Sequence, residues 1–190
     1  YMGMEYLRRK LNRKRQRVNL RYKYYDMKNY TRDFGISTPP ELRAFNSSLG
    51  WCAKAVDSLA DRVVFNEFRN DILAMNEIYQ MNNPDILFRS AELSAMIAGC
   101  AFIYIQPAEK KNEAPLMQVI DGANATGIID TVTGLLKEGY AVMERDEYGT
   151  VLTEAYFLPN ETLVYHKGET GAMRIRHVVN YPLLVPVIYR

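Results

Sequence analysis

The segment PDILFRSAELSAMIAGCAFIYIQ, residues 84–106, decides the fold class, because the period of its apolar residues changes within it. Up to Gly99 the apolar residues occupy most sides of a predicted helix, with Asn83 as the expected N-cap and Pro84 at the first helical position. Residues 101–106 have the composition of a β-strand. The segment therefore predicts a central helix that leads directly into a first strand.

Three further helices are predicted before this segment, over residues 4–29, 47–65 and 70–81. The first has a narrow apolar stripe, which predicts a helix that lies along a surface without deep burial. This stripe consists of Met4, Leu7, Leu11, Val18, Tyr22 and Tyr25. The second has a broad stripe, so we expect it to share one core with the central helix. The expected core residues are Leu49, Cys52, Val56, Leu59, Val63, Leu87, Ala91 and Ile97.

Strands are predicted after the segment, each bounded by residues typical of turns. Their ranges are 117–120, 140–145, 151–158, 162–167 and 173–179. Two hairpins follow each other directly, so we expect residues 140–179 to form one antiparallel sheet. Because helices come first and strands second, the predicted class is α+β: a long basic N-terminal helix and a helical cluster, followed by an antiparallel β-meander.

Composition limits the class of protein. Of the 190 residues, 48% are hydrophobic and 24% are charged, which is typical of a globular protein and excludes a disordered chain. The longest apolar run, residues 95–105, is too short to cross a bilayer, so we expect no membrane partner. Cys52 and Cys100 are too few for a disulfide framework, and we expect both to be core residues of a protein made in a reducing cytoplasm.

Charge is distributed unevenly along the chain. Residues 1–32 contain eleven Lys or Arg against Glu5 and Asp26, a net charge of +9, whereas the other 158 residues carry −7. Such a basic arm is expected to meet nucleic acid, a membrane surface or an acidic face of a like subunit. Its cations surround the predicted helix and cannot all meet one straight duplex, which favours an intersubunit or surface-lying helix.

Basic and aromatic residues alternate at the end of this arm. Mixing of this kind suits nucleic acid, a protein interface or, least specifically, a solvated helix. The candidate interface or nucleic-acid residues are Arg8, Arg9, Arg13, Lys14, Arg15, Arg17, Arg21, Tyr24 and Tyr25.

No set of residues predicts catalysis, a metal or a cofactor. His166 and His177 fall on neighbouring predicted strands, where they can approach each other, but no third ligand lies near them. The pairs Asp57–Asp61 and Asp121–Asp130 have spacings that can hold a cation, although a solvated helix face and turn roles are the expected functions. We therefore expect a protein that is not an enzyme, and an unrecognised active site stays open as an alternative.

The order of the segments resembles the N-terminal, or wing, part of phage portal proteins, the head-to-tail connectors of long-tailed double-stranded DNA phages. The resemblance covers nearly the whole chain in order and pattern, without a sharp motif. Its segments are Tyr24-Tyr25-Asp26 at the end of the basic helix, the helix 51–63, Gly99 to Ile105, Val119-Ile120-Asp121, and the segment Pro182 to Val187.

The resemblance implies a function and a division of the chain. It implies a homo-oligomeric ring, usually dodecameric, at one capsid vertex of the virion, assembled in the cytoplasm of a host bacterium. DNA is packaged and ejected through such a ring. The implied partners are the terminase large subunit, major capsid and scaffolding proteins, a head-tail adaptor, and double-stranded DNA through stem and clip parts that would follow residue 190. The alternative is a non-catalytic nucleic-acid-binding domain that uses the basic helix.

The expected parts are a basic helical arm (1–32), a helical core leading into a first strand (33–107), an antiparallel β region (108–180) and a connector (181–190). We expect residues 182–190 to leave the sheet extended and exposed.

Overall fold

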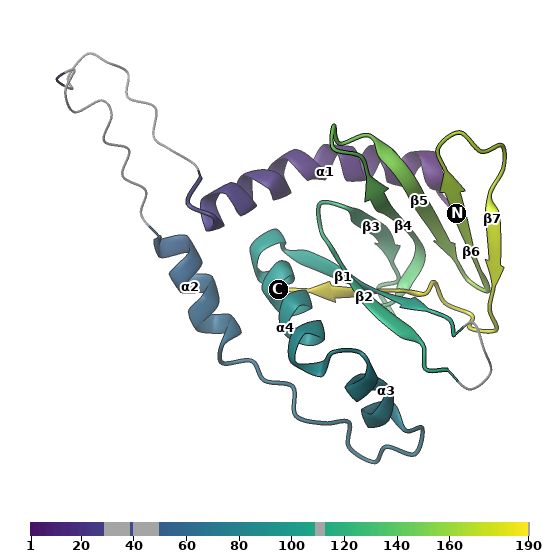
Figure 1. The fold of residues 1–190 in the computed structure, drawn as a ribbon, viewed down its shortest axis with the longest axis horizontal. Helices are drawn as coiled ribbons and strands as arrows, with labels where there is room; N and C mark the ends of the chain where they lie inside the picture. Colours follow the sequence, from purple (N-terminus) through teal and green to yellow (C-terminus); the bar gives the residue numbers. More distant parts are fainter. Residues whose placement is uncertain (29–38, 40–49, 109–112, 190) are drawn as a thin grey trace.

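The computed structural model describes residues 1–28, 39, 50–108 and 113–189, and the fold is α+β, as the sequence predicted. Helices occupy the first half and antiparallel strands the second (Figure 1). The helices are α1 (Met4–Tyr25), α2 (Trp51–Ala60), α3 (Met75–Met81) and α4 (Pro84–Ala98). The strands are β1 (Cys100–Gln106), β2 (Leu116–Asp121), β3 (Ala125–Ile129), β4 (Leu136–Arg145), β5 (Val151–Leu158), β6 (Glu161–His166), β7 (Met173–Arg176) and β8 (Leu184–Ile188).

The larger sheet is antiparallel and has the order β3-β4-β5-β6-β7. The predicted sheet over residues 140–179 is therefore confirmed, with β3 and the start of β4 added at one edge. At the β4–β5 turn, Asp146 accepts hydrogen bonds from the backbone N–H groups of Tyr148 and Thr150, and Gly149 has a φ of 81°. The turn residues in the sequence thus mark the hairpin correctly.

The smaller sheet has the order β2-β1-β8 and corrects the prediction for the last residues. Residues 182–190 were expected to be exposed, but Leu183 and Leu184 are 8% and 1% exposed. The segment is extended, as expected, because it pairs with β1, with Leu184 opposite Tyr104 and Pro186 opposite Phe102. Pairing covers an edge of β1 and buries Leu184, whereas residues 185–187 are half-buried and Ile188 stays exposed. Pro186 is tolerated because β8 is itself an edge strand.

The two faces of the larger sheet bury different sets of side chains, as the period of two along a strand requires. One face packs against the smaller sheet in a core that includes Phe102, Tyr104, Ala155, Phe157 and Leu184. The other face contacts α1 through a second cluster. That cluster consists of Leu7, Leu11, Tyr140, Val142 and Tyr156. The larger sheet is therefore the middle layer, between the smaller sheet and the first half of α1.

Helix α4 is central, as predicted, and contacts α1, α2, α3 and all three strands of the smaller sheet. It begins at Pro84, and the carbonyl of Asn83 accepts hydrogen bonds from the N–H groups of Ile86 and Leu87. The side chain of Asn83 makes no capping bond. The prediction of Asn83 as the N-cap and of Pro84 at the first helical position is confirmed. No helix among the described residues is long and apolar enough to cross a membrane.

Helices α2 and α3 are shorter than predicted. Asn70 and Ala74 have positive φ values of 54° and 55°, which end any helix before Met75. Asp71 instead accepts hydrogen bonds from the backbone N–H groups of Met75 and Asn76, both 2.6 Å long. An aromatic cluster of Phe65, Phe68, Tyr79 and Phe88 connects α3 to α4.

The predicted helical core is largely wrong. Leu87, Ala91 and Ile97 of α4 are buried, but Cys52, Leu59 and Val63 are exposed, Val56 is half-buried, and Ala60 is the buried residue of α2. Leu49 lies outside the described residues. The apolar stripe of α2 is wider than the surface on which α2 contacts α4. Most of the stripe therefore stays exposed.

We therefore expect Leu59→Ala to change the free energy of unfolding by less than about 0.5 kcal/mol, because this side chain is 48% exposed. Leu87→Ala on α4 is the matched comparison, and it should cost about 2–5 kcal/mol because Leu87 is 5% exposed. Urea unfolding of both variants measures the difference. A loss of more than about 2 kcal/mol for Leu59→Ala would contradict the placement of α2.

Candidate functional site

Helix α1 lies along one edge of the chain and contacts β3, β4, α2 and α4 (Figure 1). The prediction of a helix lying on a larger body is confirmed. The expectation that it buries little is wrong, because Leu7 and Leu11 are 0% and 1% exposed and Val18 is 4% exposed. A narrow stripe suffices for full burial here, since the larger sheet offers a matching row of apolar side chains.

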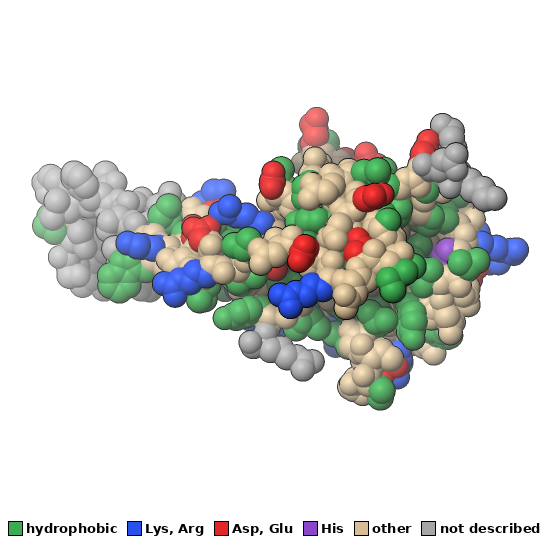
Figure 2. Space-filling view, turned by 90° about the horizontal axis from the view of Figure 1, so that it is seen from below, with side chains coloured by type: hydrophobic (Ala, Val, Ile, Leu, Met, Phe, Trp, Pro, Cys, Tyr) green, Lys and Arg blue, Asp and Glu red, His purple; other side chains and the backbone are tan. Residues whose placement is uncertain are grey.

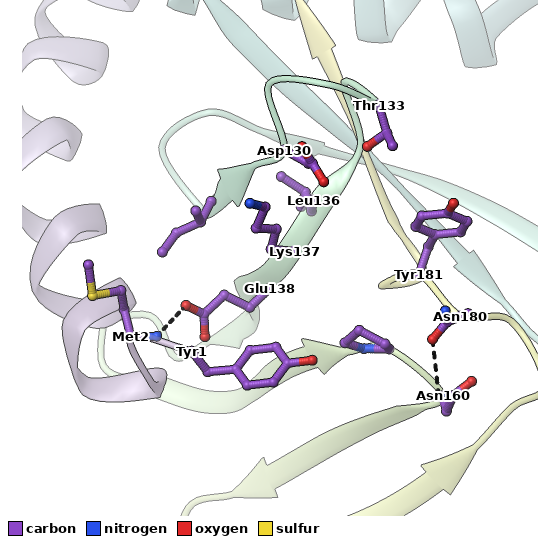
Figure 3. A pocket seen from close by; sticks show the side chains of 12 residues that line it. Tyr1, Met2, Asp130, Thr133, Leu136, Lys137, Glu138, Asn160, Asn180 and Tyr181 are labelled. Atoms are coloured by element: carbon purple, nitrogen blue, oxygen red, sulfur yellow. Dashed lines mark hydrogen bonds between the residues drawn. The ribbon is translucent and has the colours of Figure 1, made fainter.

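A buried carboxylate holds the first residues of α1 (Figure 3). Glu138, on β4, is 1% exposed, and its oxygens accept hydrogen bonds from the backbone N–H groups of Met2 (2.7 Å) and Gly3 (3.3 Å). The hydroxyl of Tyr156 donates a third bond of 2.6 Å to it. Burial, followed by this hydrogen bond, raises the pKa of Tyr156. A carboxylate at a helix N-terminus also interacts favourably with the helix dipole.

Glu138 also lines a cavity of 660 Å³, together with Tyr1, Asp130, Thr133 and Tyr181 among others (Figure 3). Both oxygens of Glu138 are engaged by the backbone N–H groups and by Tyr156. The carboxylate therefore anchors α1 and is not directed at a ligand in the cavity.

A second carboxylate anchors α1 one turn further along. Glu154, on β5, accepts hydrogen bonds of 2.5 Å from the guanidinium of Arg8 and from the hydroxyl of Tyr140. Glu5 accepts another bond from Arg8. The hydrogen bond to Glu154 is the main cause of a raised pKa for Arg8. Arg8 therefore serves the contact between α1 and the sheet, with Tyr140 completing the network.

The Tyr140 network predicts a loss of stability at alkaline pH. Burial, then the bond to Glu154, raises the pKa of Tyr140 to about 12, from 10.0. Between these values the unfolded chain releases a proton that the folded chain keeps, so stability falls as pH rises. Tyr140→Phe should cost about 1 kcal/mol at pH 8, and its deficit against the wild type should shrink between about pH 10 and 12. Urea unfolding across this range measures the deficit, and Tyr148→Phe at an exposed turn is the control. A deficit that does not change with pH would contradict the assignment.

Two lysines of α1 bind carbonyl groups of β3. The ammonium of Lys10 donates to Gly127 and that of Lys14 donates to Ala125, each over 2.7 Å. Lys14 also lies 3.5 Å from the sulfur of Cys100 and over the ring of Phe102. Burial lowers the pKa of Lys14. Both cations are thus used to attach α1 to the edge strand of the larger sheet.

The second half of α1 is attached to the helices. Arg21 donates a bond of 2.7 Å to the carbonyl of Ala98, the last residue of α4, where a cation stabilises the helix end. Tyr22 bonds Ser94 of α4, and the hydroxyl of Tyr25 donates to Asp57 of α2. That bond raises the pKa of Tyr25 to about 12. Helix α1 is therefore an integral part of the fold along its whole length.

The side of α1 opposite the buried stripe faces solvent, and we call it the outer α1 face. It consists of Tyr6, Arg9, Arg13, Arg17, Leu20 and Tyr24. Their spacing of three or four residues places them in one row along the helix. Beside this row runs a groove of 540 Å³ lined by Tyr6 and the five cations Arg9, Lys10, Arg13, Lys14 and Arg17. This arrangement can bind an extended anionic surface and contact apolar groups at both ends of the row.

The structure thus divides the nine candidate residues. Four hold α1 in place, namely Arg8, Lys14, Arg21 and Tyr25. Four belong to the outer α1 face, namely Arg9, Arg13, Arg17 and Tyr24. Arg15 is half-buried on the flank; burial lowers the pKa of Arg145, and the charge of Arg15 adds to this effect. The cations surround the helix, as the sequence indicated, but the exposed Arg9, Arg13 and Arg17 share one side.

Sequence reasoning missed two carboxylates that anchor α1, one by its first backbone N–H groups and one by Arg8. Glu138 and Glu154 are the carboxylates that hold α1, and neither was a candidate. A signal was present: the alternation along each strand places Glu138 on the face of Tyr140, and Glu154 on the face of Tyr156. A charged residue at such an inward position indicates a buried partner.

The remaining predicted pairs have structural roles. Asp57 accepts the bond from Tyr25, and Asp61 forms an ion pair with Arg89 at 2.5 Å. Asp121 accepts from the N–H groups of Ala123 and Asn124, so its predicted turn role is confirmed. Asp130 accepts from the N–H of Val132, again a turn role. Within the described ranges, no three His, Cys, Asp or Glu side chains are grouped so that they could hold a metal ion.

The predictions for the two histidines and for Cys52 were wrong. His166 ends β6, whereas His177 follows β7 and donates its backbone N–H to Asn160, so the two lie at opposite ends of this strand pair and do not approach each other. Cys52 is exposed, and its predicted core position is wrong, because the face of α2 that carries it does not meet α4. Cys100 is half-buried.

The sequence was compared with known proteins in two ways. No protein-family model matches the sequence, and a search among curated proteins finds no match.

Proposed function

We propose that this chain is a non-catalytic structural subunit of a phage portal, the ring at one capsid vertex through which DNA is packaged and ejected. One observation carries the proposal: large apolar side chains are exposed along α2, the residues after it and α3. They are Trp51, Leu59, Val63, Val64, Ile72, Leu73 and Met81, from 44% to 92% exposed. Exposed apolar surface of this extent is typical of a protein that functions in an assembly.

The arrangement of elements supports the portal form of this assembly. Tyr24 and Tyr25 end the basic helix, the step at Gly99 joins α4 to β1, and Asp121 ends β2 at a turn. These are the places that the resemblance assigns to them. The segment from Pro182 to Val187 gives no such support, because it belongs to the smaller sheet and is not an exposed connector.

The proposal includes the partners of a portal in the virion. These are further copies of the chain, usually twelve in all, the terminase large subunit, capsid and scaffolding proteins, a head-tail adaptor, and double-stranded DNA. The acidic side chains considered as candidates, Asp57, Asp61, Asp121 and Asp130, bind backbone groups or neighbouring side chains, which is the behaviour of a structural protein.

Particle images of the whole gene product test the proposal. Electron microscopy of negatively stained protein should show a closed ring with a central hole, and light scattering should give the mass of many copies. A protein that stays monomeric at micromolar concentration would overturn the proposal.

A second candidate function is nucleic-acid binding by the outer α1 face. The observation that favours it is the single row of Arg9, Arg13 and Arg17, with a rise of about 6 Å between successive arginines. Beside the row runs the groove whose described lining residues are five cations and Tyr6. Three phosphate contacts would give a slope of about −3 for log affinity for duplex DNA against log salt concentration. Replacing the three arginines by Gln should abolish that slope. An unchanged slope would contradict this function.

A further inference from the structure

The chain carries a second surface whose chemistry complements the outer α1 face. It is formed by the residues that follow α2, by α3 and by the start of α4, and we call it the acidic α3 face. Its large apolar and acidic exposed residues are Val63, Val64, Glu67, Ile72, Leu73, Glu77, Met81, Asp85 and Ile86, and Arg62 and Arg69 are exposed among them. Residues 61–86 contain five acidic and two basic side chains, a net charge of −3. Figure 2 views this side and shows hydrophobic, acidic and basic side chains interspersed over it.

The two surfaces match in pattern as well as in sign. The outer α1 face has three arginines between apolar groups, with Tyr6, Leu20 and Tyr24 each 43% to 48% exposed. The acidic α3 face has carboxylates between aliphatic side chains, with Ile72 and Leu73 92% and 77% exposed. Arginine and tyrosine are the residues that contribute most at protein interfaces, and complementary charge selects the partner.

One chain cannot bring these surfaces together. Helix α1 and helix α3 lie at opposite edges of the molecule, with the sheets and α4 between them (Figure 1). A contact between them must therefore join two copies, with different surfaces used on each copy. Such a head-to-tail contact repeats from copy to copy and closes into a ring when the rotation permits.

We propose that the outer α1 face of one copy docks on the acidic α3 face of the next copy. Arg9, Arg13 and Arg17 meet the carboxylates of Glu67, Glu77 and Asp85, while Tyr6, Leu20 and Tyr24 cover the exposed aliphatic groups. The inference rests on the proposed function, since it names the contact that builds the ring. It also assigns the same three arginines to a protein partner instead of nucleic acid.

Charge reversal on each surface tests the contact in the whole gene product. The α1 variant is Arg13→Glu with Arg17→Glu, and the α3 variant is Glu67→Arg with Glu77→Arg; all four side chains are exposed. Each variant alone should associate with itself at least about tenfold more weakly than the wild type, because like charges then face each other. The protein that combines all four changes should assemble again, since the charges are complementary once more.

Mixing the two variants identifies the contact as head-to-tail. The outer α1 face of the α3 variant can dock on the acidic α3 face of the α1 variant, and the two reversed faces are complementary to each other. An equimolar mixture should therefore assemble with the two variants alternating in equal numbers, although neither variant assembles alone. Native mass spectrometry with one variant isotopically labelled measures this composition. Lys137→Glu with Lys167→Glu, and Glu147→Arg with Glu169→Arg, make the same charge changes at exposed sites elsewhere and should assemble like the wild type.

The outcomes separate this inference from the proposed function. A wild-type ring that both variants still form would overturn the docking contact and leave the ring function standing. A wild type without any ring would overturn both. Intact assembly of the α1 variant with a loss of duplex DNA affinity would replace the contact by the nucleic-acid function. Circular dichroism of each variant establishes that it is folded, and the four-change protein makes the test independent of any loss of folding in a single variant.

Discussion

Phe157→Ala is expected to lower the free energy of unfolding by about 3–5 kcal/mol. Phe157 is fully buried on β5, in the core between the two sheets. Its ring lies edge-on to Tyr104 of β1, with ring centroids 5.2 Å apart. Truncation removes the aromatic contact and leaves a cavity that strands on both sides prevent from collapsing.

Urea unfolding followed by circular dichroism measures this loss. Tyr148→Ala is the control, because Tyr148 is 92% exposed at the β4–β5 turn and should change stability by less than about 0.5 kcal/mol. A loss below about 1 kcal/mol for Phe157→Ala would mean that the two sheets do not share this core.

Leu11→Ala is expected to cost about 2–5 kcal/mol, because Leu11 is 1% exposed between α1 and the larger sheet. This measurement decides whether the basic helix is part of the body or an arm that can leave it. Leu20→Ala on the same helix is the matched comparison, and it should cost less than about 0.5 kcal/mol because Leu20 is 45% exposed on the outer α1 face. Equal, small losses for both variants would show that α1 is not held on the sheet in solution.

The unfolding curves of these variants also bear on the docking contact. Leu20 belongs to the surface proposed to meet the next copy, so Leu20→Ala should weaken assembly while leaving the folded chain stable. Leu11→Ala should instead lower the free energy of unfolding of the single chain, and any effect on assembly should follow from that loss. The same helix therefore separates folding from assembly by the side on which the residue lies.

Sequence patterns predicted the elements that local chemistry controls. The change of period after Gly99 located α4 and β1, and Pro84 located the start of α4. Turn residues located the β4–β5 hairpin, where Asp146 and Gly149 supply the bonds and the backbone conformation that the turn needs. Signals of this kind lie within a few residues of one another, so they are readable without a partner.

Local sequence signals did not predict which residues of α2 and of the last strand are buried. A broad apolar stripe on α2 indicates a surface that favours burial, but α4 covers only the side with Ala60, and Cys52 and Leu59 stay exposed. Residues 184–188 contain Pro186 and looked like a connector, yet the free edge of β1 pairs with them. In both cases the result depends on which distant segment is available to cover an apolar face.

By itself, the sequence determined that the first helix is long, strongly basic and amphipathic with a narrow stripe, because these properties follow from the spacing of residues along one helix. Only the tertiary structure decided what each cation does. Arg8, Lys14 and Arg21 bind groups on Glu154, Ala125 and Ala98, which are 77 to 146 residues away in the chain. Arg9, Arg13 and Arg17 are exposed on the other side of the helix, and they form the cationic row of the outer α1 face. The physical reason is that charge is a property of the residue, whereas its partner is set by the packing of segments far apart in the chain.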